Sequence, residues 1–325
     1  MNRPAANLLL RTNVTLMRSL RRTKATLLDG NAIADKILDD LKQEVDKLDT
    51  IGIMPVLAPI VVGSHPESQI YLRKKYEAAR KIGLRVRVEK VDHDVKFFDL
   101  LRLIQNLNDD EGVHGVLVQL PLPEHLPEAE ICNAVDPSKD VDGFTRENLG
   151  ALVQADQSKL STRNFLPCTA RAVESILRSL EEAGKRDLSG GRAVVLGRSL
   201  NVGLPISLVL QADRNKGGFD LTTTVCNRMT KNLGDLVKSA DLVVSAAGVP
   251  GLITPEMLKE DAIVIDVGLT RTAGNKVLGD VREDVKEMDG VTLTPVPGGV
   301  GPCTVASLMC NTVLAARRTA IRWSV

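Results

Sequence analysis

The sequence predicts an α/β protein of two domains, each built on a parallel sheet covered by helices. Its 325 residues are enough for two substantial cores. Runs with helical spacing alternate with short apolar strands along most of the chain, as repeated β-α units require. An apolar strand over residues 192–196 leads through a glycine turn into a helix, which is typical of a dinucleotide-binding Rossmann domain.

The first half of the chain contains the elements of one such sheet. Between residues 31 and 48 the apolar residues recur at helical spacing: Ile33, Ile37, Leu41, Val45 and Leu48. The elements predicted after this helix are a strand over 55–63, a helix over 68–83, an alternating strand over 84–89, a helix over 97–107 and a strand over 113–119. Gly83 is a suitable C-terminal cap for the second helix.

The second half repeats the pattern from about Pro167. The predicted elements are a helix over 169–182, a strand over 192–196, a helix over 203–211, and strands over 222–226, 242–245 and 262–267. Strands of this kind, joined by helices, form a parallel sheet that is buried on both faces.

The composition is that of a globular protein without an evident nucleic-acid or metal site. Hydrophobic residues make up 43% and charged residues 26%, and the formal net charge is +1, so no basic surface for nucleic acid is indicated. The five cysteines include no Cys-x-x-Cys pair, and the four histidines are scattered. We therefore expect no metal and a reducing compartment.

The N-terminus differs from the rest of the chain. Residues 1–26 carry several Arg and Lys residues among Leu, Ser and Thr, and no acidic residue occurs before Asp29. This composition is typical of a mitochondrial transit peptide, and its apolar part is too short to span a membrane. We expect a mitochondrial protein that does not associate with membranes. A basic tail without targeting function, or an upstream start codon, would instead leave the protein in the cytoplasm.

Residues 295–304 form an unusual loop sequence, Pro-Val-Pro-Gly-Gly-Val-Gly-Pro-Cys-Thr, immediately before a helical segment. Glycine lets the backbone approach a ligand closely, and proline stiffens the loop. Taken alone, the segment is compatible with a ligand-binding loop and with an ordinary turn between strand and helix.

Further motifs precede this loop in a characteristic order. They are Ser68-Gln-Ile-Tyr71-Leu-Arg-Lys-Lys75, Gly115-Val-Leu-Val-Gln119-Leu-Pro-Leu-Pro123, Ser138-Lys-Asp140-Val-Asp142-Gly-Phe144 and Gly197-Arg-Ser-Leu-Asn-Val-Gly203-Leu-Pro205. With the glycine loop, the set resembles the bifunctional methylenetetrahydrofolate dehydrogenase/cyclohydrolase family from about Leu27 to about Arg318. The resemblance implies a folate-binding catalytic α/β domain over residues 27–145, a Rossmann-type NADP-binding domain over 146–320, and a cleft between them. The last helix, from about residue 303, would pack back onto the first domain.

The resemblance also implies the roles of the catalytic residues. Tyr71 and Lys75 are four residues apart, so on a helix they lie on one face. From the sequence alone, a single lysine such as Lys75 is usually a solvated surface charge, and Gln119 could satisfy the backbone of a loop. The resemblance makes Lys75 the acid/base group, Gln119 the amide that orients it, and Tyr71 the contact for the flat pterin part of folate. A lysine acts as a base near neutral pH only when it is desolvated or lies near other cations.

The same resemblance implies the residues that bind the substrate. Asp142 offers the acceptor that the amino and ring N–H groups of a pterin need, whereas Asp140 is expected to cap its loop. The full substrate-binding set is Ser68, Tyr71, Asp142, Pro297 and Gly301.

The expected cofactor turn departs from the common dinucleotide fingerprint, because Gly197-x-Ser199-x-x-x-Gly203 lacks the middle glycine. After the next strand the chain has Arg228 where an NAD enzyme usually carries an acidic residue. Arg228, Arg198 and Ser199 suit a ribose 2′-phosphate, so NADP is the predicted cofactor. The complete cofactor-binding set is Gly197, Arg198, Ser199, Gly203, Arg228, Gly268 and Thr304.

Three departures from the family pattern accompany the resemblance. Cys303 stands where relatives usually have methionine, Ala170 follows Pro-Cys-Thr where they have a second proline, and many relatives carry histidine and serine near residues 227 and 228.

The function that the resemblance implies is the interconversion of tetrahydrofolate one-carbon units. The protein would oxidise 5,10-methylenetetrahydrofolate with NADP and then hydrolyse 5,10-methenyltetrahydrofolate to 10-formyltetrahydrofolate, as a homodimer that contributes to purine biosynthesis. Two alternatives stay open. One is a dehydrogenase that lacks the hydrolase activity or prefers NAD, and the other is a non-catalytic regulator that binds NADP or folate.

Overall fold

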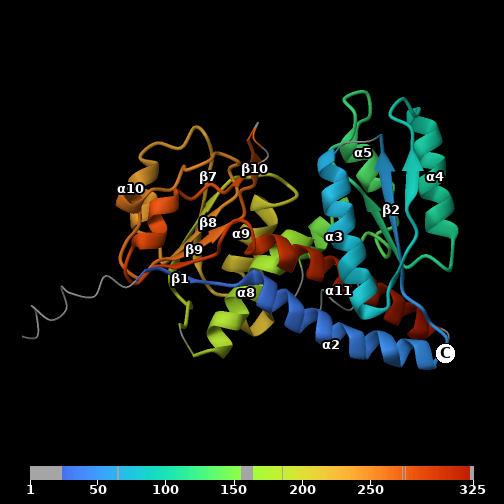
Figure 1. Cartoon of the computed structure of the whole chain (residues 1–325), viewed down its shortest axis with the longest axis horizontal. Coiled ribbons are helices and arrows are strands. Elements are labelled where there is room, and N and C mark those ends of the chain that lie inside the picture. The colour runs from blue at the N-terminus through green and yellow to red at the C-terminus, as the bar shows by residue number, and fades with distance from the viewer. Residues whose placement is uncertain are drawn as a thin grey trace, which may run out of the picture.

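The described chain forms two lobes, each with its own parallel sheet, joined by long helices (Figure 1). The computed structural model describes residues 24–63, 66–154, 164–184, 186–272, 274 and 276–322, except for the side chains of residues 66–71 and 321–322. The α/β class expected from the sequence is confirmed, because the lobes contain two mainly parallel sheets with helices packed against them.

The first sheet has β2 (Val56–Val62) at its centre. Its parallel partners are β3 (Arg85–Val86) and β4 (Glu89–Val91) on one edge and β5 (Gly115–Val118) on the other. The helices of this lobe are α3 (Pro66–Ile82), α4 (Phe97–Asp109) and α5 (Glu128–Asn133). Every residue of β5 is buried, so the residue that follows it, Gln119, leaves the sheet directly from the core.

The strand predicted over residues 84–89 is wrong as a single element, because it is divided into β3 and β4. The Arg87 N–H donates to the Leu57 carbonyl over 2.9 Å, so Leu57 faces this edge of the sheet. Backbone groups alternate between the two edges of a strand, and Pro59 therefore faces the same edge. Because proline has no N–H to donate, the pairing is interrupted there and resumes with Glu89 opposite Ile60.

The second sheet has six strands in the order β1-β12-β9-β8-β6-β7, and all pairs are parallel. Their bounds are β1 (Thr26–Leu27), β6 (Arg192–Leu196), β7 (Thr222–Cys226), β8 (Leu242–Ser245), β9 (Ile263–Asp266) and β12 (Thr292–Leu293). The strands predicted at 192–196, 222–226 and 242–245 coincide with β6, β7 and β8. The helix α9 (Gly203–Gln211) follows β6, also as predicted.

The first described residues belong to the second sheet, which corrects the boundary expected at residues 26 and 27. Thr26 pairs with Thr292 of β12, and the Ala25 N–H donates to the Lys286 carbonyl over 2.9 Å. Ala25 is buried. The fold therefore includes residues from Lys24 onward, and its first strand completes the second sheet instead of starting the folate-binding domain.

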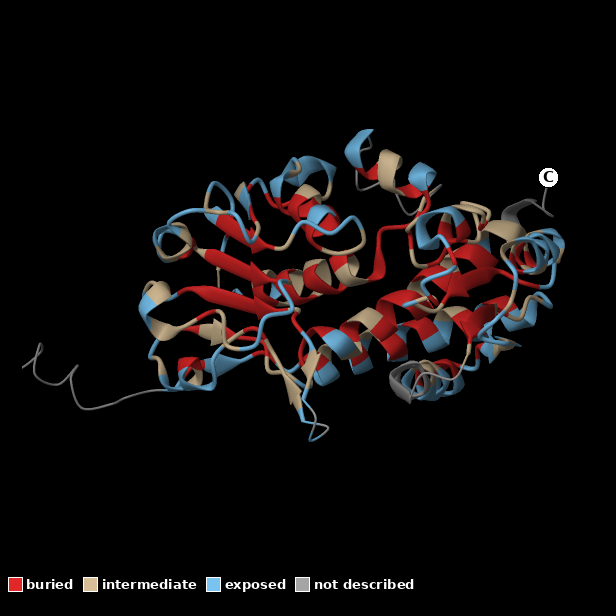
Figure 2. Ribbon diagram, turned by 90° about the horizontal axis from the view of Figure 1, so that it is seen from above, coloured by how far each residue is buried: buried red, intermediate tan, exposed pale blue. Residues whose placement is uncertain are grey.

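Three helices connect the lobes: α2 (Gly30–Thr50), α8 (Cys168–Glu182) and α11 (Val300–Arg322). The α11 helix packs against both α2 and α8 and also contacts α3 and β5. One cluster of buried apolar side chains runs from Leu57 in the first sheet, through these helices, to Ile265 in the second, and Figure 2 shows this continuous buried core. The two lobes are thus held by shared packing, which gives the space between them defined walls.

The remaining elements are short. They are α6 (Arg146–Gln154), α10 (Leu233–Lys238), the hairpin of β10 (Thr270–Arg271) and β11 (Val277–Leu278), and the 3₁₀ turns Arg214–Lys216, Pro255–Met257 and Glu283–Glu287. Among the described helices, none combines the length and the apolar character that crossing a membrane requires.

Candidate active site

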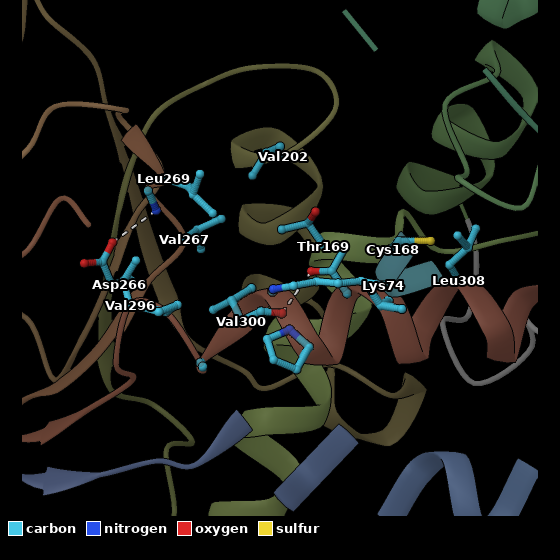
Figure 3. Close-up of a pocket in the computed structure, with 18 of the residues that line it drawn as sticks. Lys74, Cys168, Thr169, Val202, Asp266, Val267, Leu269, Val296, Val300 and Leu308 are labelled. Carbon is cyan, nitrogen blue, oxygen red and sulfur yellow. Dashed lines mark hydrogen bonds between the residues drawn. The ribbon is translucent and has the colours of Figure 1, made fainter. Parts of the chain in front are cut away.

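A cavity of about 380 Å³ lies between the two lobes, at the carboxyl ends of β5 and β9. Of the residues predicted for the site, it brings together Lys75, Gln119, Asp142, Gly268, Pro297, Gly301 and Thr304. Figure 3 shows Asp266, Val267 and Leu269 on one side of the space and Cys168, Lys74 and Leu308 on the other. The loop over residues 295–304, whose sequence left two interpretations open, lines this cavity and is therefore placed to contact a ligand.

Lys75 and Gln119 are in direct contact. The Lys75 Nζ donates to the Gln119 Oε1 over 2.8 Å, and the Gln119 Nε2 donates to the Leu120 carbonyl over 2.9 Å. The second bond turns the amide so that its oxygen faces the ammonium. Burial lowers the pKa of Lys75 below its usual value, and the nearby charge of Asp142 opposes this shift. Burial therefore shifts Lys75 toward the neutral amine that a base requires.

Asp142 faces the same cavity from the loop that precedes α6. Burial raises the pKa of its carboxyl above the usual range, and the nearby charge of Lys75 acts in the opposite direction. Its neighbour Asp140 is buried and accepts hydrogen bonds from the backbone of Gly143 (3.0 Å) and Thr145 (2.7 Å). The sequence distinguished these two aspartates in the same way: Asp140 closes the loop, and Asp142 is left to face a ligand.

Cys168 also lines the cavity, although no role for it was predicted from the sequence. It begins α8, and its thiol is buried and donates to the Val141 carbonyl over 3.2 Å. Burial and the charge of Asp142 raise the pKa of Cys168 well above its usual value, so the group is a neutral thiol. Thr169 lines the cavity beside it. The Pro-Cys-Thr segment noted in the sequence was the signal that could have pointed to both residues.

The glycine loop is packed closely against the start of α2. A Cβ on Gly30 would overlap the Gly299 carbonyl, whereas a Cβ on Gly301 would meet nothing. The first turn of α11 is therefore open toward the cavity at Gly301. Cys303, the departure from the usual methionine, is buried and donates from its thiol to the Gly30 carbonyl over 3.3 Å, which accounts for a small polarisable residue at this position.

The turn after β6 lies next to the cavity but contributes only Val202 to its lining. Gly197 has a φ of +118°, and a Cβ there would overlap the Ala246 carbonyl; a Cβ on Gly203 would overlap the carbonyl of Gly197. These are the positions where a dinucleotide-binding turn needs glycine for a tight bend and for close approach of helix and strand. Gly197, Ser199 and Gly203 thus form one compact turn that leads into α9.

Arg198 and Arg228 follow the adjacent parallel strands β6 and β7, so both lie at the carboxyl edge of the sheet. Both are exposed. Within the described part of the chain, neither guanidinium forms an ion pair, although many other arginines do. Two cations that form no ion pair among the described residues, beside a glycine turn that opens a helix, suit the binding of a phosphate group.

Two predicted residues, Ser68 and Tyr71, lie on α3 but their side chains are outside the described residues. Their helix carries Lys75 into the cavity. Among the described residues, no group of three His, Cys, Asp or Glu side chains is arranged to hold a metal ion.

Comparison with known protein families gives a match for each lobe. Residues 28–142 match the family described as "Tetrahydrofolate dehydrogenase/cyclohydrolase, catalytic domain", and residues 167–320 match "Tetrahydrofolate dehydrogenase/cyclohydrolase, NAD(P)-binding domain". The chain belongs to this family. The family resemblance seen in the sequence is therefore confirmed, and the two matches divide the chain where the cavity separates the lobes.

Individual members of the tetrahydrofolate dehydrogenase/cyclohydrolase family support this assignment. The chain is 42% identical to the Bifunctional protein FolD of Moorella thermoacetica, over 90% of this chain and 99% of that protein. A crystal structure of the bifunctional FolD of Campylobacter jejuni matches with a TM-score of 0.82 at 40% identity, covering 91% of this chain and 99% of that one. The FolD structure of Trypanosoma brucei, "complexed with NADP cofactor and inhibitor", matches with a TM-score of 0.80 at 37% identity, covering 92% and 99%.

Proposed function

We propose that this protein oxidises 5,10-methylenetetrahydrofolate to 5,10-methenyltetrahydrofolate with NADP and then hydrolyses the product to 10-formyltetrahydrofolate. The observation that carries the proposal is the hydrogen bond between Lys75 and Gln119 inside a cavity that both lobes line. Similar proteins at about 40% identity are named as bifunctional enzymes of this reaction pair. An intact pair also favours catalysis over the alternative of a non-catalytic regulator.

Asp142 orients the substrate in this proposal. Its carboxylate accepts hydrogen bonds from the amino and ring N–H groups of the pterin, while Pro297 and Gly301 also line the cavity. Tyr71 and Ser68, on the same helix as Lys75, contact the flat part of the folate. This arrangement places the one-carbon bridge between the Lys75 amine and the second lobe, where the oxidation takes place.

The second lobe suits a dinucleotide. Gly197 and Gly203 leave no room for side chains where the turn meets its neighbours, and Gly268 and Thr304 line the cavity. We assign the phosphate groups to the turn at residues 197–203 and the nicotinamide end to Gly268 and Thr304. When bound there, NADP supplies the acceptor for the hydride of the first step.

NADP is preferred over NAD in this proposal because of Arg198 and Arg228. Their exposed guanidinium groups flank the carboxyl ends of two neighbouring strands, and a guanidinium pairs with a phosphate through two parallel hydrogen bonds. Ser199 adds a hydroxyl at the same turn.

The hydrolysis depends on the first lobe. The neutral Lys75 amine takes a proton from a water molecule as that water attacks the cationic methenyl carbon, and the resulting ammonium gives this proton to N5 of the folate as the bond from N5 to that carbon breaks. The hydroxyl left on the carbon loses its proton to solvent as it becomes the formyl carbonyl, so the hydrolysis releases one proton overall. Gln119 holds the amine in place through both transfers, because its oxygen accepts from the lysine in either protonation state. Burial lowers the pKa of Lys75, which increases the share of free amine at a given pH.

A spectroscopic assay tests the whole proposal. Purified protein is mixed with methylenetetrahydrofolate and either NADP or NAD, and the formation and the decay of methenyltetrahydrofolate are followed separately. Formation and decay with NADP are expected. Formation without decay would instead support the dehydrogenase alternative, and no reaction with either cofactor would support a regulator.

Three further properties belong to the proposal: a homodimer, a contribution to purine biosynthesis and a mitochondrial location. The dimer and the purine connection rest on the family. The location rests on the basic composition of residues 1–26, which precede the first family match at residue 28. Retention in the cytoplasm is the competing outcome.

A further inference from the structure

Two buried aspartates interlock at the carboxyl edge of the second sheet. Asp266 ends β9, and its Oδ1 accepts the backbone N–H groups of Gly268 (3.1 Å) and Asp280 (3.0 Å). Its Oδ2 accepts the N–H of Val281 over 2.9 Å. Asp266 therefore ties the segment after β11 to the end of its own strand.

The second aspartate, Asp280, anchors the segment that follows β8. Its Oδ2 accepts from the Ser245 hydroxyl (2.8 Å) and from the backbone N–H groups of Ala247 (2.8 Å) and Gly248 (3.2 Å). Its Oδ1 accepts the N–H of Val249 over 2.8 Å. Asp280 is completely buried, so one carboxylate holds three successive backbone groups away from water.

Glycines make room for both carboxylates. A Cβ on Gly268 would overlap the carboxylate of Asp280, and a Cβ on Gly279 would overlap that of Asp266. The contacts continue to the glycine turn at residues 197–203, because Gly197 packs directly on the carbonyl of Ala246. The anchored segment after β8 thus lies between the aspartate pair and the turn after β6.

The segments that follow β8 and β9 each carry an exposed apolar side chain. Val249 is 48% exposed and Leu269 is 42% exposed, and Leu269 lines the cavity (Figure 3). An exposed apolar side chain on each of two rigidly held segments forms a surface suited to a flat ring. Asp280 itself is not among the residues that line the cavity.

We propose that Asp280, supported by Asp266, is a positioning residue for the oxidation step. Asp280 holds residues 247–249 through its carboxylate, and Asp266 holds Gly268. Together the two aspartates keep these segments where they form the wall for the nicotinamide half of the dinucleotide. The inference rests on the proposed function, and it assigns Asp280 to cofactor placement only. The hydrolysis of methenyltetrahydrofolate depends on Lys75, Gln119 and Asp142, and among the described residues no hydrogen bond joins any of them to the aspartate pair.

The test compares the two activities in the variant Asp280→Asn. An amide keeps the size of the side chain but points an NH₂ group toward backbone N–H donors, so part of the anchoring is lost. The KM for NADP is expected to rise about tenfold or more, which corresponds to the loss of charge-assisted hydrogen bonds. Hydrolysis of added methenyltetrahydrofolate is expected to stay within about twofold of wild type, since its residues lie on the other lobe.

Asp241→Asn is the matched control. Asp241 accepts the Arg192 N–H over 2.8 Å and forms an ion pair with Lys259 at the opposite, amino edge of the same sheet. Both activities should persist in this variant. A milder variant, Ser245→Ala, removes only the hydroxyl bond to Asp280 and should raise the KM for NADP by a smaller factor. If Asp280→Asn does not fold, the KM for NADP of Ser245→Ala tests the positioning role of Asp280 in its place.

An unchanged KM for NADP in Asp280→Asn, or a parallel loss of both activities, would overturn the inference. Activity of the wild-type protein tests the proposed function separately. If wild type failed to oxidise methylenetetrahydrofolate, fluorescence titration of NADP into wild type and the Asp280→Asn variant would still measure the anchoring, and equal affinities would refute it.

Discussion

The Lys75 ammonium donates to Oε1 of Gln119 over 2.8 Å and thereby connects the middle of α3 to the carboxyl end of β5. The two residues are 44 positions apart in the chain. Their contact depends on the packing of α3 beside the sheet, and the second amide bond to Leu120 leaves the glutamine only one useful orientation. The pair is therefore rigid before any substrate binds, which is what a positioned acid/base group requires.

Replacing Lys75 by Met is expected to abolish hydrolysis of methenyltetrahydrofolate. Removing a positioned acid/base group typically lowers a rate by about 10²- to 10⁴-fold. The affinity for NADP, measured by titration, should survive because the turn at residues 197–203 lies in the other lobe. Lys42→Met, at an exposed position of α2, is the control. Hydrolysis in Lys75→Met within about threefold of wild type would exclude lysine as the acid/base group.

The rate of hydrolysis is expected to depend on pH through Lys75. The free amine is the active form, so the rate should rise as the pH increases through a pKa that burial holds below the usual lysine value. Gln119→Glu places a carboxylate beside the ammonium, which favours the charged form. The rising limb of the pH–rate profile should then move to higher pH. An unmoved limb would show that another group titrates.

The choice of cofactor is expected to depend on Arg228. Arg228→Ser removes a guanidinium that only NADP can use, so the KM for NADP should rise about tenfold to a hundredfold. The KM for NAD should stay nearly unchanged, as should kcat at saturating NADP, because the 2′-phosphate is remote from the reacting carbon. Steady-state kinetics with both cofactors provide the measurement. Equal losses would mean that the arginine supports the loop, leaving Arg198 and Ser199 to explain the preference.

The N-terminal extension is expected to be separable from the fold at residue 23. Residues 1–23 fused to a fluorescent protein should carry it into mitochondria, and deleting them should leave both activities intact. Deleting residues 1–27 should lower the free energy of unfolding by about 2 kcal/mol, because β1 loses its backbone hydrogen bonds to β12. A diffuse cytosolic signal from the fusion would reject mitochondrial targeting. Equal free energies of unfolding for the proteins lacking residues 1–23 and 1–27 would reject a boundary of the fold at residue 23.

Much of the candidate site could be predicted because its residues stand in local motifs. Gly197 and Gly203 occur between an apolar strand and a helix, and that context alone indicates a dinucleotide turn. Lys75, Gln119 and Asp142 were taken from the family resemblance, and the structure places all three at one cavity. Cys168 could not be assigned in this way, because a cysteine at the start of a helix has no property in sequence that shows which loop it will meet.

Elements whose patterns are complete within a few residues could be predicted from the amino-acid sequence alone. The strands β6, β7 and β8 are short apolar runs bounded by turn residues, so their limits coincide with those predicted.

Other features depend on the tertiary structure, because their cause is distant along the chain. The break between β3 and β4 comes from the missing N–H of Pro59 in the neighbouring strand, and β1 is a strand only because β12, near the other end of the chain, offers it a partner. The interlocked pair of Asp266 and Asp280 also depends on distant parts of the chain. A buried carboxylate is stable only where several N–H groups donate to it. The segments after β8, β9 and β11 supply these groups, and they come together only once the second sheet has formed.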